Sequence, residues 1–208
     1  MYLSIDTTTQ FSGLALYGEN FQKELLWKTK FDHSQKLLIY IDKFLKENKV
    51  SYKDLKGIVV ISGPGSFTGI RIGVCVGNTL AWSLNIPILA IDTLLAQALL
   101  LKEKKVVAIL KASKNEAYLA KFQNLKKIGS YKIVPKKQIL NLTKGFLIVA
   151  QFPDLKIKKG LIIDKASKNH RALEAIKFIY QDLKTKRKFT KPVHPFYLKK
   201  PNITYPSI

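Results

Sequence analysis

The order of apolar and polar positions predicts a β-meander at the start of the chain. Two short apolar runs, Tyr2–Asp6 and Gly13–Gly18, are joined by the polar segment TTTQFS, and Phe21–Phe31 is a third candidate strand. Short apolar runs bounded by polar turns are typical of antiparallel strands. The first thirty residues are therefore predicted to form three neighbouring strands.

After the meander, the period changes to that of helices and buried strands. Gly57–Ser62 and Ile86–Ile91 are short and apolar, as strands of a buried parallel sheet are. A helix is predicted after the glycine-rich turn between them, and Asp92 or Thr93 is predicted to cap the next helix. His33–Asn48 is predicted to be an amphipathic helix, whose apolar residues recur at the spacing of one helix face: Leu37, Leu38, Ile41, Phe44 and Leu45.

A second round of the same pattern begins at Val106. The runs VVAILKA and EAYLAKFQ predict a hairpin, the runs YKIV, FLIVA and LIID predict further strands, and Ser167–Thr185 carries a broad apolar helix face. The proline-rich end predicts a terminal strand with an extended tail. We therefore predict an α/β protein of two similar lobes, 1–105 and 106–208, the second of them reduced.

Composition adds a strong positive charge to a chain that is otherwise typical of globular proteins. Lys and Arg (36) outnumber Asp and Glu (14), which gives a net charge of +22. Such a charge favours tRNA, rRNA, DNA or an acidic membrane surface, although lysines scattered along the whole chain also fit a lysine-rich coding bias. Cys75 is the only cysteine, which excludes an internal disulfide. Neither a secretory leader nor a bilayer-spanning run is recognisable, so a cytoplasmic protein with no membrane partner is expected.

The stretch ISGPGSFTGIRIGV is the most unusual motif of the chain. It lacks the lysine and hydroxyl residue that follow the last glycine of a P-loop, and its glycines miss the spacing of the dinucleotide fingerprint. In one interpretation, which we favour, Ser66 or Thr68 caps the following helix. In the other, free amide groups at the helix start attract an anion, with Arg71 nearby. The candidate anion-binding turn comprises Gly65, Ser66, Phe67 and Thr68.

Three glycines form a bare stripe along the helix that follows this turn. Gly69, Gly73 and Gly77 recur every four residues and therefore share one helix face. Each glycine destabilises a helix by about 1 kcal/mol relative to alanine, so the close approach of another element must offset roughly 3 kcal/mol. That element is either this protein's own sheet or first helix, or a helix of a partner chain.

Several motifs together resemble those of the TsaB (YeaZ) family, which helps to form threonylcarbamoyladenosine on tRNA. GPGSFTGIRIGV is close to the family signature, and SIDTTTQFSGLALYG, HSQKLLIYIDKFL, NIPILAIDTL and PFYLKKP are similar to other family segments. The resemblance implies the actin-like, sugar-kinase-like ATPase fold (ribonuclease H-like) with two similar lobes. It also implies that the chain is not an enzyme but a non-catalytic partner of TsaD, the subunit that transfers the threonylcarbamoyl group to the adenosine beside the anticodon.

The resemblance further implies partners and a docking face. The partners are TsaD, the ATPase TsaE, a second copy of this chain when TsaD is absent, and tRNA through the assembled complex. The basic charge of the chain, rather than the resemblance, makes Lys199 and Lys200 candidate contacts of the complex with tRNA. The interface is expected on the helices His33–Asn48 and Thr68–Leu84. Its predicted residues are Leu37, Leu38, Ile41, Gly69, Ile70, Arg71, Gly73, Val74 and Gly77.

The same resemblance implies a vestigial nucleotide site. Working ATPases of this fold hold Mg²⁺ with an acidic residue from each lobe. Here Asp6 remains in the first lobe, Thr8 replaces the expected glycine, and Lys111 stands where the second acid belongs. Because Mg²⁺ takes oxygen ligands, no cofactor is expected on this chain alone, and ATP and Mg²⁺ are expected only in the assembled complex.

No catalytic or metal-binding constellation is predicted. None of the histidines, His33, His170 and His194, has a second histidine four residues away, and Ser66 has no evident histidine partner. Two alternative functions stay open: an actin-fold ATPase or kinase that uses Asp6, and a basic RNA-binding module driven by the net charge.

Overall fold

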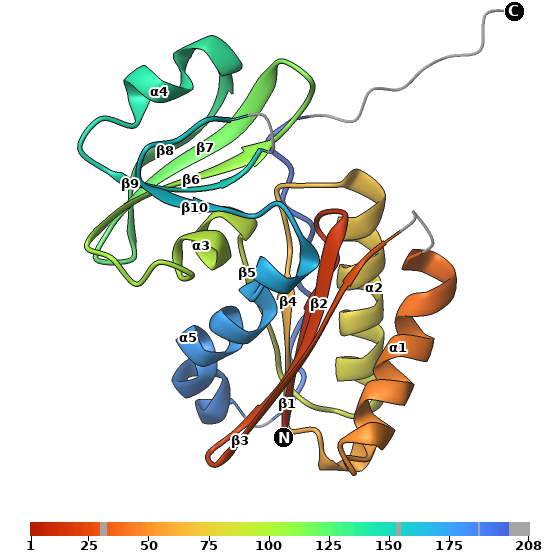
Figure 1. Ribbon diagram of the computed structural model, residues 1–208. Helices are drawn as coiled ribbons and strands as arrows, with labels where there is room; N and C mark the ends of the chain where they lie inside the picture. The colour runs from red at the N-terminus through yellow and green to blue at the C-terminus, as the bar shows by residue number, and fades with distance from the viewer. Residues whose placement is uncertain (30–32, 153–154, 187, 200–208) are drawn as a thin grey trace, which may run out of the picture.

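Two five-stranded sheets form two lobes with the same topology (Figure 1). The computed structural model describes residues 1–29, 33–152, 155–186 and 188–199. The strand order is β3-β2-β1-β4-β5 in the first sheet and, read from the corresponding edge, β8-β7-β6-β9-β10 in the second. In each sheet an antiparallel meander continues on its other side into two parallel strands. The predicted α/β fold of two similar lobes is confirmed.

The first lobe is a sheet with helices on both faces (Figure 1). Its strands are β1 (Tyr2–Asp6), β2 (Phe11–Gly18), β3 (Phe21–Lys28), β4 (Gly57–Ile61) and β5 (Ile88–Ile91). Its helical elements are α1 (His33–Glu47), η1 (Tyr52–Asp54), α2 (Phe67–Ser83), α3 (Thr93–Ala98) and α5 (Arg171–Thr185).

Alternation of side chains along the strands gives this sheet two apolar faces. Ile5 and Val60 point toward α1 and α2, whereas Tyr2 and Val59 point toward α5. The Asp92 carboxylate accepts a hydrogen bond from the Leu95 amide at 2.9 Å and so caps α3. Of the two predicted caps for that helix, Asp92 is the one that is used.

The second lobe is smaller and has less helical cover. Its elements are β6 (Lys105–Lys111), β7 (Glu116–Gln123), β8 (Lys126–Pro135), η2 (Lys136–Gln138), α4 (Ile139–Leu142), β9 (Leu147–Gln151) and β10 (Gly160–Ile162), and η3 (Ala166–Lys168) leads back to the first lobe. The inner face of its sheet, with Val106 and Ala108, packs toward α3. The outer face, with Val107 and Ile109, packs against Ile139 of α4.

The predicted boundary of the second lobe, 106–208, is wrong in its C-terminal part. α5 returns to the first sheet, where Ala172 and Ile176 pack with Tyr2 and Val59. The predicted helix Ser167–Thr185 is also divided, because η3 and α5 are separate elements. The apolar stripe of α5 is therefore the missing cover of the first sheet.

The predicted terminal strand is absent from residues 188–199. This segment runs along α2, where Val193 and Tyr197 pack against the apolar cluster of the first lobe. Pro192 and Pro195 lack amide hydrogens, which disfavours a sheet ladder. Instead, the Asn78 side chain of α2 donates to the Val193 carbonyl and accepts from its amide, each at 2.9 Å.

Candidate functional site

The glycine-rich turn is built by close contacts with neighbouring backbone. Gly63 has φ +117°, and a Cβ atom there would lie 2.2 Å from the Phe196 carbonyl oxygen, so only glycine fits. The Ser66 amide donates to the Thr8 carbonyl at 2.6 Å, which holds the turn against the loop after β1. The Ser66 hydroxyl accepts from the Gly69 amide at 3.2 Å and caps α2. The capping interpretation is confirmed for Ser66, while anion binding at this turn stays a prediction.

The glycine stripe of α2 is occupied by this chain's own sheet, which corrects the expectation of a partner's helix there. Gly69, Gly73 and Gly77 are all buried. A Cβ atom at Gly69 would meet the Thr7 carbonyl oxygen at 2.0 Å, and one at Gly73 would meet the Thr7 hydroxyl at 2.3 Å. At Gly77 the neighbour is a Val60 methyl group of β4, at 2.4 Å. The three glycines let α2 lie directly on Thr7, which follows β1, and on β4.

Most of the other predicted interface residues are also buried within the chain. Leu37, Ile41, Ile70 and Val74 belong to the apolar cluster between α1, α2 and the first sheet. Their helical spacing marks the face of each helix that this protein buries itself. Side chains that this protein buries against its own sheet are not exposed to a partner, so these four residues do not form a docking face in this structure.

The remaining two predicted interface residues, Leu38 and Arg71, are exposed. Leu38 of α1 is 53% exposed, whereas the Arg71 guanidinium stacks on the Phe67 ring and donates to the Tyr197 hydroxyl at 3.2 Å. Arg71 thus serves to hold the terminal segment on α2.

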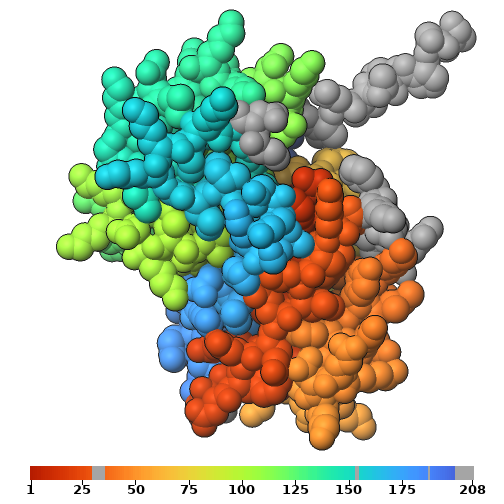
Figure 2. Space-filling model, in the orientation of Figure 1, coloured from red at the N-terminus to blue at the C-terminus, as the bar shows by residue number. Residues whose placement is uncertain are grey.

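The outward side of α1 and α2 carries apolar side chains that the sequence reasoning missed. Ile39, next to Leu38 on α1, is 63% exposed. Trp82, near the end of α2, is 70% exposed. α1 and α2 pack side by side, and the orange atoms of α1 form part of the molecular surface (Figure 2). The sequence could have indicated their exposure, because these apolar residues fall outside the helical spacing of the buried face.

A cleft of about 450 Å³ lies between the lobes. Thr8 and Ser66 line it from the first lobe, and from the second lobe it is lined by Lys111, at the end of β6, and Lys114, in the turn before β7. This is where the sequence resemblance placed the vestigial nucleotide site, and the structure brings Thr8 and Lys111 together there. Its charged lining is basic, contributed by the two lysines.

Asp6 does not contribute to that cleft, because its carboxylate is consumed by internal contacts. The side chain is fully buried and pairs with the Arg171 guanidinium at 2.9 Å. Thr8 donates to the other carboxylate oxygen through its amide at 3.0 Å and its hydroxyl at 2.7 Å. Asn169 lies 3.3 Å from the paired oxygen. Both oxygens of Asp6 are thus engaged by protein donors, while its part in a vestigial nucleotide site stays a prediction.

Arg171 is the residue that the sequence reasoning missed most clearly. It is the first residue of α5, is fully buried, and donates to Gln151 of β9 and to the Thr9 hydroxyl, each at 2.9 Å. One guanidinium therefore joins β1, the following loop, α5 and the second sheet. An arginine at the edge of an apolar helix face was the only signal for it.

Known proteins share these sequence and fold features. A family model described as "TsaD: tRNA N6-adenosine threonylcarbamoyltransferase" matches residues 28–193. The "tRNA threonylcarbamoyladenosine biosynthesis protein TsaB" of Buchnera aphidicola (subsp. Acyrthosiphon pisum) is 29% identical over 203 residues, 89% of this chain and 91% of that protein. The Bacillus subtilis protein of the same name is 42% identical over 93 residues, 44% of this chain and 41% of that protein. The chain belongs to the TsaB (YeaZ) family.

The solved structures extend this likeness to the fold of the TsaB family. "YeaZ from Pseudomonas aeruginosa" has a TM-score of 0.72 and 22% identity, and covers 90% of this chain and 94% of that one. A second Pseudomonas aeruginosa structure, described as an uncharacterized protein with similarity to peptidase YEAZ, has a TM-score of 0.73 and the same identity. At this identity the likeness shows a common fold.

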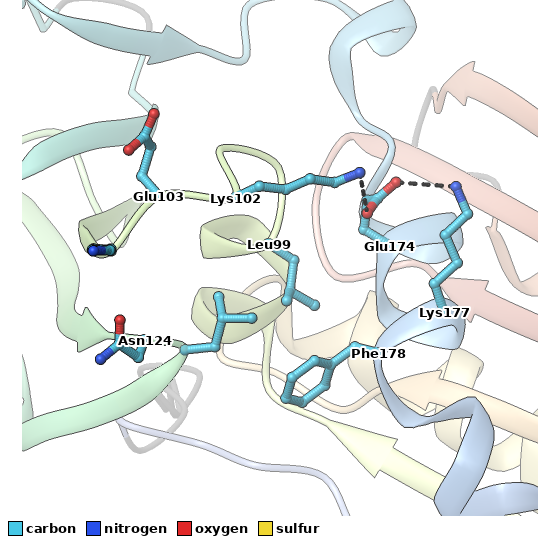
Figure 3. Close-up of a pocket in the computed structure, with 9 residues that line it drawn as sticks. Leu99, Lys102, Glu103, Asn124, Glu174, Lys177 and Phe178 are labelled. Atoms are coloured by element: carbon cyan, nitrogen blue, oxygen red, sulfur yellow. Dashed lines mark hydrogen bonds and ion pairs between the residues drawn. The ribbon is translucent and has the colours of Figure 1, made fainter.

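This TsaB-family chain has a further pocket of about 490 Å³ between α3, α5 and the turn after β7 (Figure 3). Its apolar wall includes Leu99 and Phe178. Glu174 lies at its rim and pairs with Lys102 at 3.7 Å and with Lys177 at 3.3 Å. The carboxylate of Glu174 is therefore shared by two lysines of this protein.

His170 of the TsaB-family chain is paired with a carboxylate of the first lobe. His170 lies with its Nδ1 atom 2.6 Å from a Glu24 carboxylate oxygen. Within the described ranges, no three His, Cys, Asp or Glu side chains are grouped closely enough to hold a metal ion. Nor do those ranges contain a helix with the length and apolar character needed to cross a membrane.

Proposed function

We propose that this chain is a non-catalytic subunit of the machinery that forms threonylcarbamoyladenosine on tRNA. We further propose that it binds the TsaD transferase through the outward side of α1 and α2. The similarity to TsaB proteins along nearly the whole chain supports the pathway. The observation that carries the docking proposal is the exposure of Leu38, Ile39 and Trp82 on these two neighbouring helices.

Physical reasoning favours this side as an interface. A tryptophan that is 70% exposed leaves a large apolar ring in water, and such rings are enriched among the residues that dominate binding energy. Leu38 and Ile39 are further exposed apolar side chains, on the adjacent helix α1. In the absence of TsaD, we propose that the same side pairs with a second copy of this chain.

The proposed absence of catalysis rests on the charges around the inter-lobe cleft. Asp6 is paired with Arg171, and Lys111, which the family resemblance sets in the place of the second acid, lines the cleft. A lysine does not coordinate Mg²⁺, which takes oxygen ligands. This arrangement argues against the ATPase or kinase alternative. ATP, Mg²⁺ and the ATPase TsaE are proposed to act only in the assembled complex.

Leu38→Glu tests the docking side, and Leu140→Glu is its matched control. Both leucines are 53% exposed, but Leu140 lies on α4 in the second lobe. Placing a charge in a buried interface should weaken binding to purified TsaD by about 2 kcal/mol or more, roughly 30-fold in Kd. Calorimetry measures the affinity, and thermal unfolding checks that both variants fold.

The expected result is loss of TsaD binding, and of TsaD-dependent tRNA modification, for Leu38→Glu but not for Leu140→Glu. Trp82→Ala should behave like Leu38→Glu. Equal binding by the wild-type chain and all three variants would overturn the proposed docking side. Magnesium-dependent ATP hydrolysis by the isolated chain, abolished in Asp6→Asn, would overturn the non-catalytic role.

A further inference from the structure

The net charge of the chain is concentrated outside its first 104 residues. Residues 105–165, which form the second lobe, contain fourteen lysines and three acidic residues, for a net charge of +11. Residues 1–104 contain twelve basic and nine acidic residues, for a net charge of +3. The second lobe therefore has a much higher density of positive charge, which an even coding bias does not explain.

The lysines of the second lobe form no ion pairs with carboxylates among the residues that the structure describes. Glu116 is taken by Lys199 at 2.8 Å, and Asp164 by Lys168 at 2.9 Å, both from outside the lobe. The positive charges of this lobe thus repel one another and attract polyanions.

Strand register places several of these lysines on the outer face of the second sheet. Side chains two residues apart on a strand share a face, so Lys121 lies on the same side as Leu119 of the outer apolar cluster. Lys132 of β8 is the register partner of Leu119 and shares that face. A hollow of about 100 Å³ is lined by both lysines, together with Gly129 and Ser130.

Aromatic rings beneath the lysines hold them in place. The Lys121 ammonium lies 4.9 Å from the centre of the Phe146 ring. The ammonium groups of Lys136 and Lys111 lie 5.3 and 5.8 Å from the centre of the fully buried Phe152 ring. Such contacts order long side chains that would otherwise be mobile in water. The outer face consequently presents a partly ordered group of positive charges.

We propose that this outer basic face, defined by Lys121, Lys132 and Lys136, binds the phosphate backbone of RNA, namely the tRNA on which the proposed machinery acts. The assignment of tRNA rests on the proposed function, whereas the polyanion chemistry rests on the charges alone. Each lysine that neutralises a phosphate releases condensed counterions, which drives binding without base recognition. A membrane surface fits this face less well, because its lysines project from a sheet, and the α-helix on this face, α4, has only four residues.

The test compares two triple variants of equal net charge. The first is Lys121→Gln, Lys132→Gln and Lys136→Gln. The control is the same change at three exposed first-lobe lysines that make no ion pair among the described residues: Lys23, Lys49 and Lys53. Fluorescence anisotropy with a labelled, unmodified tRNA transcript measures Kd between 50 and 200 mM salt, roughly the range over which phosphate contacts are resolved.

The second-lobe triple variant should bind tRNA about tenfold or more weakly at low salt, with the slope of log K against log salt reduced by about two to three. The control should change affinity less than about twofold. Equal losses in both variants would overturn the proposal, because they would show a response to net charge alone. Binding to phosphatidylserine vesicles in preference to tRNA would also overturn it.

Association with TsaD separates this inference from the proposed function. The second-lobe triple variant should co-elute with TsaD like the wild-type chain, and thermal unfolding should be unchanged. If the second-lobe triple variant bound both tRNA and TsaD as tightly as the wild-type chain does, the proposed RNA-binding face would be overturned. The proposed function would still stand. Loss of TsaD binding in Leu38→Glu with unchanged tRNA affinity would support both assignments independently.

Discussion

Replacing Arg171 with methionine should destabilise the protein because it strands the Asp6 carboxylate. Both side chains are fully buried, and their charged atoms lie 2.9 Å apart. Removing one partner of a buried ion pair generally lowers the free energy of unfolding by about 3–5 kcal/mol. Asp6 would keep its hydrogen bonds from Thr8 and Asn169, which favours the lower end, about 3 kcal/mol.

A double-mutant cycle separates this pair from loss of packing. Asp6→Asn combined with Arg171→Met removes both charges, so the double variant should be less destabilised than the sum of the two single variants by about 2 kcal/mol. Urea unfolding followed by circular dichroism gives the four free energies, and an unchanged m-value shows that the denatured state is comparable.

Two results would refute this reasoning. An Arg171→Met effect below about 1 kcal/mol would mean that water or another donor replaces the guanidinium. Simple additivity in the cycle would mean that Arg171 acts through Gln151 and Thr9 rather than through Asp6. Either outcome would reopen Asp6 as a residue available to bound ligands.

Three further predictions follow from the local geometry. Gly69→Ala should lower the free energy of unfolding by about 1–3 kcal/mol in urea titrations despite the helix preference of alanine, because the added methyl group meets the Thr7 carbonyl oxygen; no loss would mean that α2 shifts freely. Ser66→Ala removes the cap of α2 and should cost about 0.5–2 kcal/mol, whereas Ser66→Asp should retain most of it. Burial raises the pKa of the Asp92 carboxyl above its ordinary value of 3.8. The folded state therefore holds the Asp92 proton to higher pH than the unfolded chain does. The stability that comes from this proton is complete below pH 3.8 and is lost as pH rises through the pKa of the folded state. Asp92→Asn keeps a capping side chain and should remove that fall in stability with pH, as seen in urea midpoints measured across the acid range.

Local sequence patterns predicted the elements of this fold well. The meander, α1, the strands around the glycine-rich turn and the β6–β7 hairpin all follow from periodicity and turn residues, which act over a few neighbouring positions. Duplication was also visible, since both halves repeat one order of strands and helices. Periodicity did not predict which sheet α5 packs against. An apolar helix face indicates that the face is buried, but not which surface buries it.

The site was less predictable for the same reason. Helical spacing identified Gly69, Gly73 and Gly77 as a face of close approach, but both an internal sheet and a foreign helix satisfy that pattern. In the structure this stripe packs on the chain's own sheet. Trp82, which is not part of the stripe, is exposed to solvent. Arg171 lies 165 residues from Asp6, so their pairing exists only in the folded chain.

The return of α5 to the first sheet has a consequence for how the chain is made. The part of that sheet that α5 covers stays open to water until residue 185 has left the ribosome, long after β5 has been synthesised. At translation rates of about 5–20 residues per second, those roughly ninety residues take about 5–20 seconds. For that interval the nascent chain exposes apolar surface of an incomplete first lobe. We therefore expect chaperones that shield newly made polypeptides to bind it.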